Sequence, residues 1–247
     1  MEKLPLNRIL YTGATFIALL ATQVLLGKAG HFVANQFSYA QIDPHDAFAS
    51  ISVHHFAQMV FALIIIIALG KLLKIDFYLK LGNIRKGTKY VAIFTGVFAF
   101  AAIMLHLFLS LNNQLPTYAF PLDCRNILGT IGFQLFLSGP SEEVIFRALP
   151  ITILVYTFGR SIQIRKSFTV EVIMASILFS FAHLNWSLAP FSFEVDSFQL
   201  VYAVILGTIQ GIVYQKTESI VYPALMHSFS NVIMVGTGYL FTALTVA

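Results

Sequence analysis

The sequence predicts an all-α fold, a polytopic transmembrane helical bundle with about seven to eight spans. Hydrophobic residues make up 57% of the 247 residues and charged residues only 11%, whereas soluble domains have roughly 25% charged residues. Mean hydropathy is +0.80, and apolar runs close to the ~20 residues that cross a bilayer recur along the chain. The runs are continuously apolar rather than alternating, so they predict helices, which satisfy their backbone hydrogen bonds internally. This composition excludes soluble and disordered classes.

Seven apolar runs define the predicted spans: residues 9–27, 54–73, 90–110, 127–157, 168–186, 198–215 and 219–242. The fourth is long enough to tilt or kink, and Pro140 within it favours a kink. In the sixth, the four-residue spacing of Gly207 and Gly211 predicts close packing against another helix. Residues 31–53 or the C-terminal tail could add a half-helix. No repeat or low-complexity linker divides the chain, so we expect residues 1–247 to form a single integral membrane domain.

The basic residues predict the orientation in the bilayer. The loop 71–89 has six lysines and arginines and one acidic residue, and the loop 158–167 has three basic residues and no acid. By the positive-inside rule these loops and the basic N-terminus face the cytoplasm. Topology therefore accounts for the formal net charge of +4, and we expect the lipid bilayer, and no nucleic acid, as a partner. The short, loop-poor chain favours a bacterial plasma membrane.

Ionisable residues inside the fourth span indicate a functional site. A charge within a spanning helix costs on the order of 2.5–3.5 kcal/mol on insertion scales, so it is retained when it is paired or functional. Glu143 and Arg147 are four residues apart and can form an ion pair on one helix face. Glu142 points about 100° away from Glu143 and has no evident local partner. The Glu143–Arg147 pair is explained equally well as a structural ion pair that holds the helix in place. Packing gives no such reason for the second carboxylate, Glu142, so a functional role is favoured for it.

Two histidines in later apolar runs complete the candidate set. His183 follows Phe179 by one helical turn, and His227 precedes Asn231 by one turn. A carboxylate, two imidazoles and an amide from three helices are the groups needed to deprotonate a water and to stabilise an oxyanion. Counted from the predicted span boundaries, however, Glu142 lies near the middle of the bilayer, with His183 and His227 toward opposite faces. Cooperation between them requires tilted helices or shifted boundaries.

The three motifs, in this order, resemble those of the CPBP family of intramembrane proteases. They are Glu142-Glu143-x-x-x-Arg147, Phe179-x-x-x-His183 and His227-x-x-x-Asn231. The family includes the type II CAAX prenyl endopeptidases and the bacterial Abi-type proteins. The resemblance covers roughly residues 120–235, which we interpret as a catalytic core. One departure is Ala148, where many members have glycine.

The resemblance implies an intramembrane endopeptidase that hydrolyses a peptide bond of a membrane-associated, prenylated or precursor peptide or protein. It implies that Glu142 acts as general base to a water that His183 helps to hold, and that His227 and Asn231 form the oxyanion hole. Glu143 and Arg147 would hold the base-bearing helix in register, and Phe179 would shape the pocket around His183.

Three alternatives remain open on the sequence. Zinc could be the cofactor, because Glu142, His183 and His227 also form a three-ligand set with a free fourth position; we favour the metal-free version. A non-catalytic scaffold or immunity protein of the same fold would retain the helices without needing the four polar residues. A proton-relaying transporter is a third class.

Overall fold

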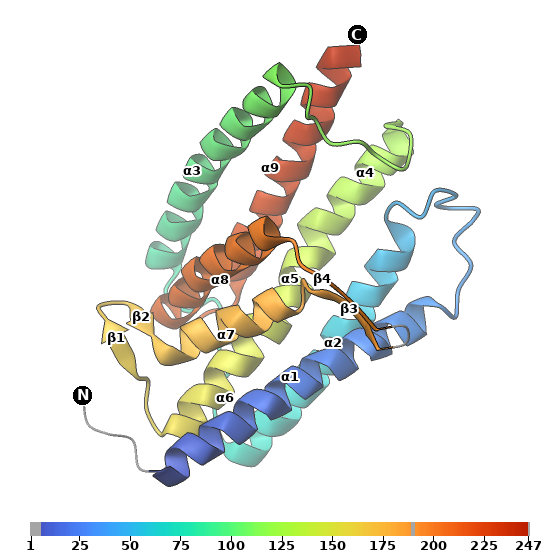
Figure 1. Ribbon diagram of the computed structural model, residues 1–247. Coiled ribbons are helices and arrows are strands. Elements are labelled where there is room, and N and C mark those ends of the chain that lie inside the picture. Colours follow the sequence, from blue (N-terminus) through green and yellow to red (C-terminus); the bar gives the residue numbers. More distant parts are fainter. Residues whose placement is uncertain (1–5, 189–190, 247) are drawn as a thin grey trace.

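Three long helices make up the N-terminal part of the chain in the computed structural model, which describes residues 6–188 and 191–246. They are α1 (Leu6–Ala34), α2 (Ala49–Leu73) and α3 (Ile84–Leu111). Helices α1 and α2 lie side by side, whereas α3 lies beside the last helix, α9 (Val221–Val246) (Figure 1). The first three predicted spans lie inside these helices.

The fourth predicted span is a continuous helical stretch whose winding changes twice. It consists of α4 (Cys124–Phe133), η1 (Gln134–Ser138), α5 (Gly139–Glu143), η2 (Val144–Ala148) and α6 (Leu149–Phe158), where η marks a π-helical turn. Pro140 and Pro150 lie in the first turns of α5 and α6. Proline donates no backbone hydrogen bond and crowds the preceding turn, which explains why the helix widens ahead of each. Such π turns are rare and are frequent at functional sites.

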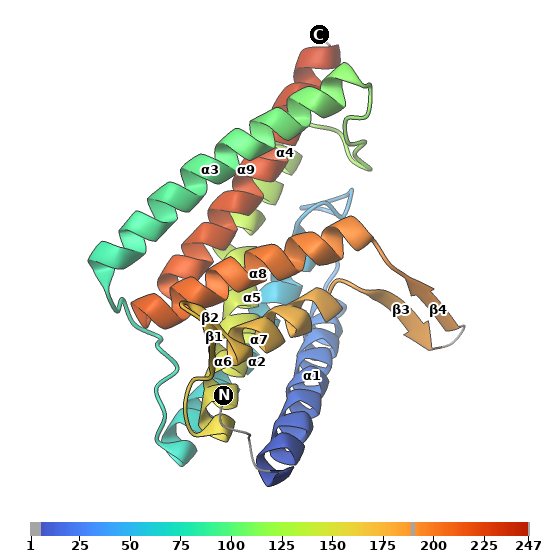
Figure 2. The same ribbon diagram turned by 60° about the vertical axis from the view of Figure 1, so that its left-hand side comes forward.

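Helices α7 (Val170–Phe181) and α8 (Ser197–Thr217) lie side by side (Figure 2). The two glycines of the sixth predicted span allow this approach. A Cβ atom at Gly211 would lie 2.9 Å from Cγ1 of Val172, and one at Gly207 would lie 3.3 Å from the side chain of Ser176. The predicted close packing is confirmed.

The fifth predicted span, residues 168–186, is only partly helical. Helix α7 has 12 residues, about 18 Å at 1.5 Å per residue, which is short of a hydrocarbon core of ~30 Å. The chain then enters an antiparallel hairpin of β3 (Asn185–Leu188) and β4 (Phe191–Glu194). A second hairpin, β1 (Gln163–Arg165) and β2 (Phe168–Thr169), precedes α7. The predicted boundary at residue 186 is therefore wrong, because apolarity alone does not separate a helix end from a strand.

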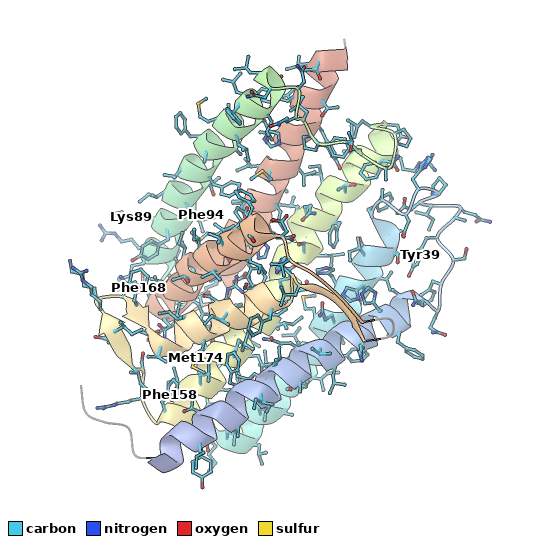
Figure 3. All side chains as sticks on the ribbon, viewed as in Figure 1. Tyr39, Lys89, Phe94, Phe158, Phe168 and Met174 are labelled. Carbon is cyan, nitrogen blue, oxygen red and sulfur yellow. The ribbon has the colours of Figure 1, made fainter. Side chains whose placement is uncertain are left out.

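The buried core lies where α1, α2, η2, α6, α7 and α8 meet. Ile145 and Leu154 are fully buried there, and Phe158 and Met174 belong to the same cluster (Figure 3). The outer faces are apolar as well: Leu25 on α1 and Phe100 on α3 are 65% and 67% exposed. Among the described residues, α1, α2, α3 and α8 are long and apolar enough to cross a bilayer. Large exposed apolar side chains on such helices are suited to lipid, and the protein is an integral membrane protein.

Asp43 fixes the start of α2. Its carboxylate is 2% exposed and accepts hydrogen bonds of 2.7–2.9 Å from the backbone N–H groups of Ala47, Phe48 and Ala49. Burial opposes ionisation of this carboxyl, but the backbone N–H groups outweigh it and hold the pKa of Asp43 below its usual value. The loop before α2 is thereby tied to the first turn of the helix.

Replacing Asp43 with alanine is expected to lower the free energy of unfolding by about 1–2 kcal/mol, as loss of a helix cap does. Because the pKa of Asp43 is lowered in the folded protein, its contribution is present above the pKa of the unfolded chain and is lost as pH falls through the folded value. Thermal unfolding in detergent at several pH values measures this. An equal difference between wild type and Asp43→Ala at neutral and strongly acidic pH would contradict the capping role.

Candidate active site

All four residues expected to take part in catalysis line one cavity of about 520 Å³. Glu142 comes from α5, His183 from the turn after α7, and His227 and Asn231 from α9. The conflict in predicted depth is removed because α7 ends at Phe181 and because the fourth helical stretch changes its winding around Glu142. His55, Gln134 and Ser138 also line this cavity.

Gly139 lets α5 approach α9 closely. A Cβ atom at this position would lie 2.5 Å from Oγ of Ser228 and 2.9 Å from the carbonyl oxygen of Ala224, closer than real Cβ atoms come. Any side chain would therefore push the two helices apart. Because Gly139 has no side chain, the carboxylates of α5 come close to His227.

Glu143 joins the two motif helices through one oxygen atom. Its Oε1 lies 3.1 Å from Nη2 of Arg147 and 2.8 Å from Nδ1 of His227. The i,i+4 ion pair expected from the sequence is thus present, and both of its side chains are fully buried. Because a carboxylate can only accept, Nδ1 of His227 must have the proton. The pair therefore orients His227 as well as its own helix.

Two further groups complete the surroundings of Arg147. Its Nη2 donates to Oε1 of Gln210 on α8 at 2.6 Å. Its guanidinium carbon lies 4.2 Å from the ring centroid of Phe179, a cation–π contact. Phe179 also makes an edge contact with His183, with ring centroids 4.6 Å apart. The expectation that Phe179 shapes the pocket around His183 agrees with this geometry, and the ring contacts the buried cation in addition.

Glu142 faces the cavity between two imidazoles. Its Oε2 lies 3.6 Å from Nε2 of His227, and its Oε1 lies 3.9 Å from Nδ1 of His55 on α2. Ser138, one turn earlier, donates to Oε1 at 3.4 Å. The side chain of Glu142 is 18% exposed, against 0% for Glu143. Successive carboxylates thus lie in different surroundings, as the helical rotation predicts.

His183 has one ring nitrogen engaged and one available. Its Nδ1 lies 2.9 Å from the carbonyl oxygen of Phe179. A carbonyl only accepts, so Nδ1 has the proton and Nε2 of the neutral ring has a free lone pair. In the described part of the chain no hydrogen bond or ion pair joins His183 to Glu142. The two residues share the cavity without touching.

Asn231 is tied to the opposite wall of the cavity. Its Nδ2 donates to Oε1 of Gln134 at 2.9 Å and to Oγ of Ser138 at 3.0 Å. Both amide hydrogens are therefore engaged within the protein. For Asn231 to donate to a substrate oxygen, one of these two bonds must be exchanged.

One family model matches the part of the chain that contains Glu142, His183, His227 and Asn231. Residues 124–233 match the family described as type II CAAX prenyl endopeptidase Rce1-like. Residues 124–233 form an Rce1-like domain. The resemblance to the CPBP and CAAX protease family is confirmed, and this is a family of proteases. No curated protein and no solved structure matches the chain.

Four polar residues of the site were missed by sequence reasoning: His55, Gln134, Ser138 and Gln210. His55 lies outside the Rce1-like domain, and the sequence shows only that it is near the start of an apolar run. Gln134 and Ser138 lie eight and four residues before Glu142, so a search of the same helix face would have found them. Gln210 lies within the Gly207–Gly211 stretch, and that stretch was interpreted from the sequence as a helix-packing motif only.

The residues expected as zinc ligands are not arranged as a metal site. Within residues 6–188 and 191–246, no three histidine, cysteine, aspartate or glutamate side chains are arranged to hold a metal ion. Glu142, His183 and His227, the expected zinc ligands, share the cavity but do not converge on one point at ligand distance. As they stand, these three residues do not fit a zinc ion.

We expect substitutions of the two adjacent glutamates to differ sharply in stability. Glu143→Gln leaves the charge of fully buried Arg147 uncompensated, and breaking a buried pair typically costs about 3–5 kcal/mol. Glu142→Gln removes a partly exposed carboxylate that faces a cavity and is expected to leave the unfolding temperature almost unchanged. Thermal unfolding of the purified proteins in the same detergent measures both. Equal unfolding temperatures for the two variants would show that the buried pair does not hold this helix.

Proposed function

We propose that this protein is an intramembrane endopeptidase that hydrolyses a peptide bond of a membrane-associated peptide or protein. The observation that supports this most is the position of Glu142. Its carboxylate faces a 520 Å³ cavity shared with His183, His227 and Asn231, while the neighbouring Glu143 neutralises Arg147. Glu142 is thus left as the one carboxylate of the pair that can act on a water.

In the proposed reaction Glu142 is the general base. A water that forms a hydrogen bond to Glu142 through one of its hydrogens can form a second one to Nε2 of His183 through the other. The lone pair of Nε2 is free because Nδ1–H of His183 is bound to the carbonyl oxygen of Phe179. The water oxygen adds to the carbonyl carbon of the scissile bond, and Glu142 takes the proton. As the C–N bond breaks, Glu142 passes this proton to the leaving nitrogen. The products are a carboxylic acid and an amine, and transfer of the remaining proton of the water between them gives a carboxylate and an ammonium group.

His227 and Asn231 would stabilise the oxyanion of the tetrahedral intermediate. Because Nδ1–H of His227 is bound to Glu143, the ring can donate from Nε2 only as an imidazolium. The carboxylates of Glu142 and Glu143, at 3.6 Å and 2.8 Å, compensate that charge. Losing one donor of an oxyanion hole typically costs about 100- to 1000-fold in rate.

The walls of the cavity favour a substrate with an apolar segment. Leu105 of α3 and Phe198 and Tyr202 of α8 contribute large side chains to the lining. Together with the CAAX prenyl endopeptidase description of the matched family, this supports a prenylated or hydrophobic precursor peptide that reaches the site from the bilayer. We propose a bacterial plasma membrane and a cytoplasmic N-terminus, on the basic loops.

Replacing Glu142 with glutamine is expected to abolish proteolysis while the protein still folds. Removal of a general base costs about 100-fold or more in rate. The measurement compares the peptides in membranes of cells that express wild type or Glu142→Gln at equal levels. Unchanged peptides together with an unchanged cellular phenotype would favour the scaffold alternative. A proton flux that only the wild type supports would favour the transporter.

We propose that the reaction needs no metal, so chelation is expected to leave peptidase activity unchanged. The purified protein is dialysed against 1,10-phenanthroline and then assayed with and without added zinc. Glu142→Gln is the inactive control. A loss of activity that zinc restores would instead support the zinc-dependent version, with Glu142, His183 and His227 as ligands.

A further inference from the structure

We infer that His55 is a positioning residue for Glu142, which deepens the proposed function and rests on it. His55 is on α2, outside the Rce1-like domain at residues 124–233. Its Nδ1 lies 2.8 Å from Oγ of Ser141 and 3.9 Å from Oε1 of Glu142. The ring thus contacts the residue before the base by a hydrogen bond and faces the base itself.

The proposed role of His55 includes one tautomer of its ring. The single hydroxyl proton of Ser141 can go to the carbonyl oxygen of Ser138 at 3.1 Å or to Nδ1 of His55 at 2.8 Å. We assign it to Ser138, so that the Ser141 oxygen accepts from His55 and Nδ1 of His55 has a proton. In this tautomer the N–H edge of the imidazole faces Oε1 of Glu142. A donor at this position attracts the ionised carboxylate.

Packing holds the His55 ring in place. Its side chain is 12% exposed, and the ring of Phe133 meets it edge-on with centroids 5.0 Å apart. The neighbouring ring of His54 lies 5.2 Å away. Asp43 fixes the start of α2 at Ala49, six residues before His55. The ring therefore acts on Glu142 from a rigid element rather than from a loop.

The two oxygens of Glu142 face imidazoles on opposite sides. His227 faces Oε2 and His55 faces Oε1. With His55 removed, Oε1 retains only the long hydrogen bond from Ser138, at 3.4 Å, and the carboxylate can rotate away from the position in which it meets a water. Such a loss affects the chemical step rather than substrate binding, so kcat is expected to fall while KM changes little.

The test uses full-length protein in liposomes and an internally quenched, farnesylated CAAX peptide. The variants are His55→Ala, which removes the donor, and His55→Asn, whose amide N–H can replace Nδ1–H. Ser141→Ala removes the acceptor. The matched control is His106→Ala, because His106 is also a buried histidine, 3% exposed, but bonds to Ala102 and Thr237 away from the cavity. Unfolding temperatures are measured for every variant.

We expect His55→Ala to lower kcat by about 10- to 100-fold, the usual cost of losing a group that orients another, with KM nearly unchanged. His55→Asn should restore most of this loss, and His106→Ala should retain the wild-type kcat. Combining His55→Ala with Ser141→Ala should cost less than the product of the two single effects, because the two residues act through one contact.

Two results would overturn the inference. One is a His55→Ala protein with wild-type kcat; the other is a loss of kcat that His55→Asn does not restore at an equal unfolding temperature. If wild type and Glu142→Gln both fail to cleave the peptide, that result contradicts the proposed function and not the role of His55. The contact between His55 and Ser141 is then tested by ¹⁵N spectra of protein with labelled histidine. A protonated Nδ1 signal that moves in Ser141→Ala supports the contact, and an unprotonated Nδ1 excludes it.

Discussion

The fully buried carboxylate of Glu143 is the group on which the site depends. One of its oxygens contacts Arg147 on the same helix and His227 on α9, so a single acceptor fixes a cation, an imidazole and the spacing of two helices. An unpaired charge at this depth would be costly, which makes the arrangement all-or-none. The close approach at Gly139 permits it. The geometry of the candidate site and the packing of these two helices therefore depend on the same interaction.

Helix geometry explains why Glu142 and Glu143 lie in different surroundings. Successive residues differ by about 100°, so one carboxylate faces the helix bundle and the other faces the cavity. The π turns before and after α5 also affect the directions of these side chains, because they change the helical winding on both sides of the two glutamates. Each π turn is followed by a proline, at 140 and 150. The irregular backbone thus coincides with the residues that have to point into the cavity.

The sequence predicted the helical class, the Glu143–Arg147 pair and the residues that share the cavity, since these depend on composition and on spacing within one helix. It placed Glu142, His183 and His227 at different depths because the depths were counted from predicted span boundaries, one of which was wrong. The short helix α7 and the hairpin after it are not visible in hydropathy. Contacts between distant segments were missed for a related reason: nothing in the spacing of residues 54 and 55 indicates that one of them faces Ser141.

The contribution of α2 changes how the domain boundary is understood. The matched family segment begins at residue 124, yet the carboxylate of Glu142 is flanked by His55 from α2, which ends at Leu73, well before that segment. A helix that only covered the bundle could present any apolar residue at that position. Burying a histidine beside the carboxylate of Glu142 is costly unless its ring is hydrogen-bonded, and His55 has a partner in Ser141. Helix α2 therefore contributes a side chain to the candidate site and does not only support it.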